Sequence, residues 1–266
     1  MRTFGAMVIA LLVATAVSQE RLDFLERART GTAKYQDQTN AVLDGYRRIG
    51  RDFPAMGEHW IRINLLFDGK IEPERPEFLT YVNVGGKPVL LGVAYALPLL
   101  PGESPPSQPA PMEAWHDHLR TVEDETVLPR HHFHMVDSGK PRLAMLHAWI
   151  WTSNPEGVFA ADNWAIPYVR LGIAAPRNVS LPSARALSLL SGGIEFFSMS
   201  IDAAVTLTAR EQTAVRGLLE RARSTVEESV RTGALDNLND HWNALSASIE
   251  AIVSPQSRAA LQTILR

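Results

Sequence analysis

The stretch EFLTYVNVGGKPVLLGVAYAL, residues 77–97, decides the fold class because it reads as two strands joined by a turn. Both runs are rich in β-branched and aromatic residues, which favour strands. Gly85 and Gly86 supply the positive φ values that a two-residue hairpin loop requires. The sequence therefore predicts an antiparallel hairpin within a β-rich region.

The flanking segments extend this predicted sheet. HWIRINLLF (59–67) alternates between apolar and polar faces, whereas RLAMLHAWIW (142–151) is apolar on both faces, as in a buried strand. A further strand is expected before the Ser138-Gly139 turn, and NPEGVFAADNWAIPYVRLGI (154–173) reads as a turn followed by a strand. Together they predict an antiparallel sheet or barrel-like domain of about six strands over residues 58–181.

Helical periodicity precedes and follows the sheet region. Apolar residues recur at three- and four-residue steps over residues 20–49, which predicts one helix, ended by Gly50 and Pro54, within an N-terminal segment 19–57. Helical periodicity returns in a tail, 182–266, where Thr208 and Glu211 form a capping box and Ser254 precedes another helix start at Pro255. The predicted fold class is α+β.

The first 18 residues resemble a secretory signal peptide. Arg2 precedes an apolar run from Phe4 to Val17, and small residues follow where a signal peptidase would cut, between Ala16 and Ser18. The run is shorter than the about 20 apolar residues of a membrane-spanning helix. We expect export to the periplasm or the extracellular space, with no stable membrane span once the signal is removed.

Composition limits the chemistry that the 266-residue chain can carry. A net charge of −3, without a basic stripe, gives no basis for nucleic-acid binding. The chain contains no cysteine, so disulfides, thiolate ligands and thiol nucleophiles are excluded. A metal site would have to use His, Asp, Glu, Met or backbone oxygen. The composition leaves a homo-oligomer open and identifies neither a protein nor a small-molecule partner.

AWHDHLRT, residues 114–121, places two histidines one residue apart. In an extended segment His116 and His118 share a face, and both rings can reach one ion; in a helix they would point about 200° apart. Pro111 favours extended backbone just before the pair. The alternative is a solvated polar loop.

Two further histidines lie on predicted strands. His59 shares the apolar face of its strand, and His147 lies in the strand that is apolar on both faces. Each alone is compatible with a core histidine bonded to the backbone. Combined with His116 and His118 they supply four nitrogens, which suits zinc or copper. His132 and His134 form a second such pair and are the alternative source.

Several motifs together resemble a family of uncharacterised secreted proteins. They are FPAMGEHW (53–60), ERPEFLTYV (74–82), LLGVAYALP (90–98) and LHAWIWTSNPEGVFAADN (146–163), in the order in which that family carries MGxHY, RPE, V-E-Y and LHAW-I-W with NP-x-G-x-F-A. The resemblance covers roughly residues 27–165 and places the family's two histidine motifs on His59 and His147. Ala94 replaces the Glu of V-E-Y. The resemblance implies no established activity.

Three functions follow as hypotheses. The first is an exported protein with a histidine-based zinc or copper site of unknown role. The second is a metal-dependent hydrolase or oxygenase, with Glu58, Asp117 or Asp162 as general base; GxSxG, HExxH and Walker motifs are absent. The third is a periplasmic helical chaperone or stress-type binding protein, because LTARE (207–211) and VSPQS (253–257) loosely resemble the LTxxQ motif of such proteins.

Overall fold

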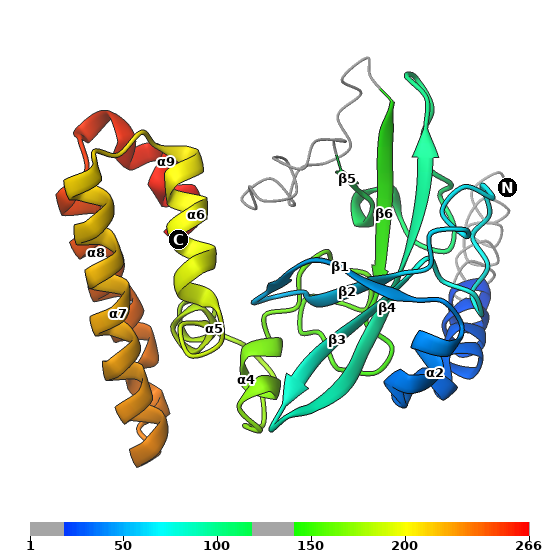
Figure 1. Ribbon diagram of the computed structural model, residues 1–266, viewed down its shortest axis with the longest axis horizontal. Coiled ribbons are helices and arrows are strands. Elements are labelled where there is room, and N and C mark those ends of the chain that lie inside the picture. The colour runs from blue at the N-terminus through cyan, green and yellow to red at the C-terminus, as the bar shows by residue number, and fades with distance from the viewer. Residues whose placement is uncertain (1–18, 119–140, 266) are drawn as a thin grey trace, which may run out of the picture.

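The computed structural model describes residues 19–118 and 141–265, and it shows an α+β fold (Figure 1). Six strands form one open sheet in which every neighbouring pair is antiparallel, so the described part of the chain contains a sheet and not a closed barrel. In sheet order the strands are β1 (Arg47–Phe53), β2 (Gly57–Ile61), β3 (Phe78–Val84), β4 (Lys87–Leu99), β6 (Arg142–Ala148) and β5 (His116–His118).

The predicted hairpin is confirmed and lies at the middle of the sheet. Gly85 and Gly86 have φ values of 58° and 84° and connect β3 to β4 directly. The thirteen-residue β4 pairs with β3 and with β6. Gly92 allows the close approach to β6, because a Cβ atom there would lie 2.6 Å from the carbonyl oxygen of Ala148.

The prediction of a single helix over residues 20–49 is wrong beyond residue 32, where that helix ends. Residues 19–32 are helical, and a 3-10 turn, η1 (Ala33–Gln36), leads to a separate short helix, α2 (Gln38–Leu43). The side chain of Asp37 caps α2 by accepting a hydrogen bond from the backbone N–H of Thr39. Gly45, with φ 94°, then redirects the backbone into β1.

Two other predicted strands are also corrected. The strand expected over residues 59–67 ends at Ile61, where turns begin. The strand expected in 154–173 is instead a series of turns and the short helix α4 (Ile166–Arg170). Asn163 precedes this helix and accepts a hydrogen bond from the backbone N–H of Ala165, while Pro167 fits its first turn. The strand expected before Ser138 lies outside the described residues.

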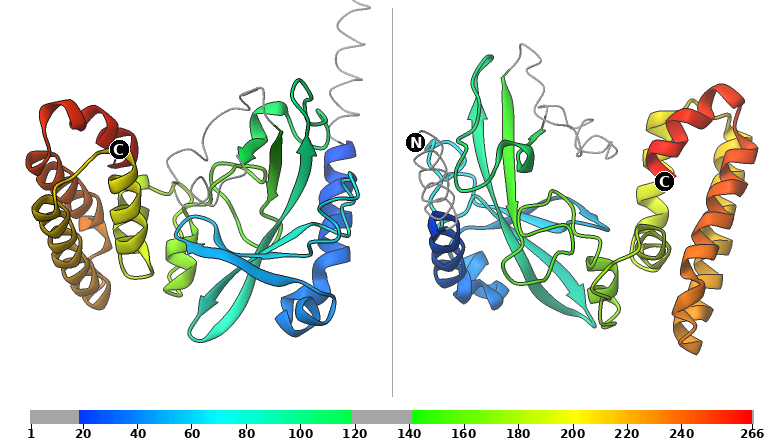
Figure 2. Two further views of the ribbon diagram at one scale, coloured as in Figure 1. Left: turned by 45° about the horizontal axis from the view of Figure 1, so that its top comes forward. Right: turned by 180° about the vertical axis from the view of Figure 1, so that it is seen from behind.

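The two faces of the sheet have different neighbours (Figures 1 and 2). Helical residues 19–32 cover one face, where Phe24 and Ala28 pack with Tyr95 and Trp115 in a common apolar core. The other face is directed toward the helical region. It carries a smaller apolar cluster that includes Ile61, Phe78, Ala94, Ala96 and Met145. The histidines lie on this second face.

The tail folds as a group of helices with its own core. The helices are α5 (Leu181–Ser188), α6 (Gly193–Ala204), α7 (Ala209–Thr232), α8 (Leu238–Ile252) and α9 (Pro255–Leu265), and the 3-10 turn η4 (Leu235–Asn237) precedes α8. Another 3-10 turn, η2 (Met112–Ala114), lies in the sheet region before β5. The capping box of Thr208 and Glu211 is confirmed at the start of α7. Ala55, in the β1–β2 turn, belongs to this core and connects it to the sheet. None of the helices in residues 19–118 and 141–265 is long and apolar enough to span a membrane.

Candidate metal centre

Three of the four predicted histidine rings lie together on the second face of the sheet. The ring centroid of His147, on β6, is 5.6 Å from that of His59, on β2, and 5.0 Å from that of His116, on β5. His116 and His147 are buried. Segments separated by about 90 residues of sequence therefore contribute to one cluster, with His147 in contact with both other rings.

Small residues on the intervening strands allow the rings of His59 and His147 to meet. Neighbouring strands lie about 4.8 Å apart, so in a flat sheet β2 and β6 would be too distant for their side chains to touch. His59 pairs with Thr80, and Thr80 pairs with Gly92; Ala94 pairs with His147. Because these three residues are small, the twisted sheet leaves room above β3 and β4 for both rings.

The two nitrogens of the His147 ring have different environments. Nδ1 lies 2.6 Å from the carbonyl oxygen of Ala161, and because a carbonyl only accepts, Nδ1 carries the proton in this tautomer. Burial lowers the pKa of His147 below its ordinary value, so the ring is neutral at pH 7. Nε2 is therefore a lone-pair donor, and it is buried without a hydrogen-bond partner among the described residues.

Aromatic side chains surround the cluster. The ring of Trp149 is 5.3 Å from that of His147, and its indole N–H donates to the carbonyl oxygen of Ala160. Phe53 and Phe78 each present a ring to His59 at a centroid distance of 6.3 Å. These rings make a poorly hydrated environment, in which a neutral imidazole is favoured over a charged one.

The extended backbone predicted for the HxH pair is confirmed by β5. Trp115 packs into the core on the first face of the sheet, and His116 lies on the second face, as alternation along a strand requires. His118 pairs with Leu143 through its backbone, but its side chain lies outside the described part. His132 and His134 also lie outside the described residues.

The three candidates for a general base differ in their position relative to the histidine cluster. Asp162 is buried, and its charge acts on His147 in the direction that raises the pKa of that ring. Glu58 is directed away from the histidines and forms an ion pair of 3.0 Å with Arg48. The side chain of Asp117 is not among those described. Asp162 is thus the candidate that adjoins the cluster.

The histidine side chains are in contact without forming a preformed metal site. Within residues 19–118 and 141–265, no group of three or more His, Asp or Glu side chains is arranged to hold an ion. The described rings pack against one another at the angles of aromatic contacts, 34° and 76°. Ion binding at this position therefore requires the imidazoles to rotate.

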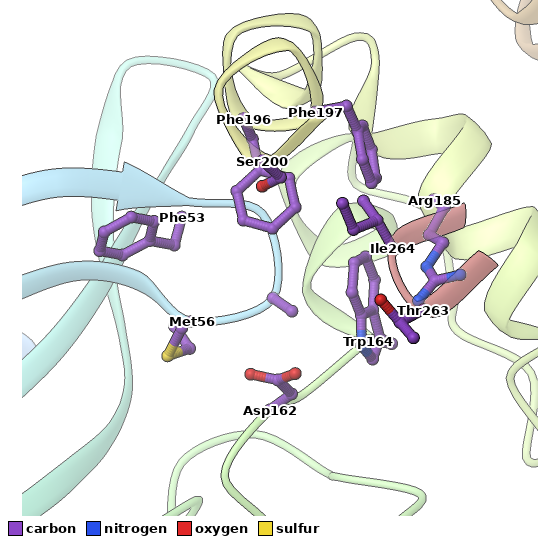
Figure 3. A pocket seen from close by; sticks show the side chains of 11 residues that line it. Phe53, Met56, Asp162, Trp164, Arg185, Phe196, Phe197, Ser200, Thr263 and Ile264 are labelled. Atoms are coloured by element: carbon purple, nitrogen blue, oxygen red, sulfur yellow. The ribbon is translucent and has the colours of Figure 1, made fainter. Parts of the chain in front are cut away.

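A pocket next to the cluster was not predicted from the sequence (Figure 3). It lies between the β1–β2 turn and the helical region, and Phe53 and Asp162 belong both to its wall and to the surroundings of the histidines. Arg185 of α5 also lines it. The available signal was an arginine within the apolar run of residues 181–190, but pattern analysis does not reveal which long-range partner such a residue faces.

Comparisons with protein-family models, with curated proteins and with solved structures find no match for this chain. The resemblance to the secreted family therefore stays a prediction. Fold and site together define an α+β protein with an open antiparallel sheet, a helical tail and a cluster of three histidine rings, two of them buried, on one face of the sheet.

Proposed function

We propose that this protein is exported and binds a divalent transition metal, zinc or copper, through His147, His59 and His116, with His118 as fourth ligand. The single observation that carries the proposal is the environment of His147. Its Nδ1 is anchored to a backbone carbonyl, and its buried Nε2 has a lone pair with no described hydrogen-bond partner.

This environment is the one that metal-binding histidines commonly have. A ligating imidazole usually donates its second N–H to a carbonyl or a carboxylate, which fixes the tautomer and the ring orientation. Leaving a buried polar atom unpaired costs about 1–3 kcal/mol, and a bound ion would remove that cost. A neutral ring is also required for coordination, and burial of His147 favours it.

The spacing of the rings fits coordination. With zinc–nitrogen bonds of about 2.0 Å, each ring centre lies roughly 3.2 Å from the ion, and two rings of a tetrahedral site have centres about 5 Å apart. The centroid distances from His147 to His116 and His59 are 5.0 and 5.6 Å. Because the ring of His147 is held by its bond to Ala161, it is the side chains of His59 and His116 that would have to rotate to aim a nitrogen at the same ion.

Elemental analysis of protein purified without chelator tests this proposal. We expect about one zinc or copper ion per chain, and a large loss of metal in the His147→Ala variant. His241→Ala is the matched control, because His241 lies on α8 and bonds to Ser229. Less than one ion for every several chains of the wild-type protein would reject the proposal.

A metal-dependent hydrolase is the second candidate function, and the position of Asp162 favours it. This carboxylate is buried beside His147 and also lines the adjoining pocket, where a general base would meet a bound water or substrate. Hydrolysis of p-nitrophenyl acetate by the metal-loaded protein would test it. Asp162→Asn should reduce turnover at least about tenfold with unchanged metal content; turnover that the variant retains in full would reject this function.

A further inference from the structure

The pocket between the sheet and the helical region has the features of a small-molecule site. The centre of a water-sized sphere can reach about 50 Å³ of this pocket, which is room for only a few water molecules, so a ligand bound there must be small. Phe53 lines it from the end of β1 and Met56 from the β1–β2 turn, Phe196 and Ser200 from α6, and Ile264 from α9 (Figure 3). Pockets at the junction of two structural units are a common location for ligands.

Arg185 gives this pocket a buried cationic group. Its side chain is only 8% exposed, and its guanidinium lies over the ring of Trp164 at 5.5 Å. Nε and Nη1 are buried and have no hydrogen-bond partner in the described part of the chain. Burial lowers the pKa of Arg185 to about 10, opposed by the charge of Asp162, so the group remains positively charged at neutral pH.

An arginine in this state is costly for a protein without a ligand. Burying a charge is unfavourable unless hydrogen bonds and an opposite charge compensate it. The stacking on Trp164 stabilises the cation, and Asp162 contributes attraction, but neither satisfies the two N–H donors. An anionic acceptor in the pocket would satisfy them.

The other side chains that line the pocket indicate which further chemical groups the ligand has. The hydroxyl of Ser200 is also buried without a described hydrogen-bond partner, so it offers a neutral donor. Apart from the carboxylate of Asp162 and the hydroxyl of Thr263, the other lining side chains are apolar, and the rings of Phe53, Phe196 and Phe197 are among them. A purely inorganic anion would leave these rings unused, whereas an organic acid with a small apolar body would contact them.

We propose that this pocket binds a small organic carboxylate, held by the guanidinium of Arg185 and the hydroxyl of Ser200, with its apolar part among the phenylalanine rings. The site requires no metal, so it stands independently of the proposed histidine centre. Because the pocket is walled by both the sheet and the tail, a bound ligand would also stabilise their association.

Isothermal titration of the purified full-length protein with benzoate and with its neutral analogue benzamide tests the proposal. Benzoate should bind at least about tenfold more tightly, since charge-assisted hydrogen bonds are the stronger kind. Arg185→Gln should abolish this preference, and Arg231→Gln, which removes an exposed arginine from α7, should leave it intact. His147→Ala should also leave it intact, which separates this site from metal coordination.

Ser200→Ala keeps the test valid if Arg185→Gln does not fold, because it removes only one hydroxyl. It should weaken benzoate binding by about ten- to a hundredfold, the effect of losing one hydrogen bond to a charged acceptor. The proposal is overturned if the wild-type protein binds benzoate no better than benzamide, if it shows no benzoate binding at millimolar concentration, or if folded Arg185→Gln retains the preference.

Discussion

The rings of His59 and His147 lie 5.6 Å apart, between centroids, although their strands are separated in the sheet by β3 and β4. On those two strands, Thr80 and Gly92 continue the row of His59, and Ala94 and Phe78 continue the row of His147. The small side chains of Thr80 and Ala94, and the absence of one at Gly92, leave space on this face of the sheet, and the two histidine rings occupy it.

Removing the metal should lower the stability of the fold. A ligand that binds only the native state stabilises it by about 2.7 kcal/mol when its free concentration is one hundred times the dissociation constant. We expect protein treated with EDTA and then freed of it to melt at a lower temperature than untreated protein, and equimolar zinc or copper to restore the melting temperature. Magnesium, which prefers oxygen ligands, is the control ion and should not restore it. Identical melting curves before and after chelation would argue against a bound ion.

Ala94→Glu should strengthen metal binding. Ala94 lies directly opposite His147 in the β4–β6 ladder, so a carboxylate introduced there would face the cluster. Without metal the variant should be less stable than the wild-type protein, because Ala94 is fully buried and a buried carboxylate is unfavourable. Competition with a chromogenic chelator measures the affinity. Ala144→Glu is a suitable comparison, since Ala144 is also buried but belongs to the core on the opposite face. If both variants bind metal equally, the side chain at position 94 does not face the histidine cluster.

Gly92→Ala should destabilise the protein by roughly 1–3 kcal/mol, the usual cost of overpacking. A Cβ atom at this position would lie 2.6 Å from the Ala148 carbonyl oxygen and 3.1 Å from the Cα atom of Trp149, both in the backbone that follows His147. Urea denaturation measures the change. Gly217→Ala, within α7, is the control, because only the end of the Arg221 side chain is near; it should be neutral or stabilising by up to about 1 kcal/mol. Equal stability of both variants would contradict the close packing of β4 on β6.

Glu77 should make the fold less stable as the pH rises above about 4.5. Burial raises the pKa of this carboxyl group from 4.5 to about 8, although its side chain accepts a hydrogen bond from the backbone N–H of Ala96. Between these two values the folded protein holds a proton that the unfolded chain has released, so the free energy of unfolding falls with rising pH. The slope contributed by one such group is at most about 1.4 kcal/mol per pH unit.

Glu77→Gln isolates this contribution, because the amide has a similar shape and does not titrate. Its stability, measured by urea denaturation from pH 5 to pH 8, should decline less with pH than that of the wild-type protein. Glu113→Gln serves as the control, since Glu113 is exposed in the turn η2 and should leave the pH dependence unchanged. Parallel pH profiles for Glu77→Gln and the wild-type protein would show that Glu77 is ionised in the fold.

Local sequence patterns were sufficient to predict those elements whose structure depends mainly on neighbouring residues in the chain. Gly85 and Gly86 identified the hairpin, and the run apolar on both faces identified β6 as a buried strand. The helical periodicity of residues 20–49 led to the wrong prediction of one long helix. Asp37 and Gly45 interrupt the helix, and residues Arg47–Phe53 form a strand that pairs with β2. A strand that forms mainly through pairing leaves little periodicity of its own.

The sequence was enough to predict which residues belong to the candidate site, but not how their side chains come into contact. Alternation placed His59 and His116 on particular faces of their strands, but their contact with His147 depends on strand order and sheet twist, which no local pattern encodes. Arg185 illustrates the same limit, because its position in the pocket depends on how α5 packs against residues 162–164.

X-ray absorption spectroscopy at the metal edge of the protein as purified shows whether imidazole nitrogens bind the ion. We expect three or four nitrogen ligands at about 2.0 Å, with the outer-shell scattering of imidazole rings, and the loss of an imidazole in His147→Ala. A first shell composed only of oxygen, or a spectrum that His147→Ala leaves unchanged, would contradict this expectation.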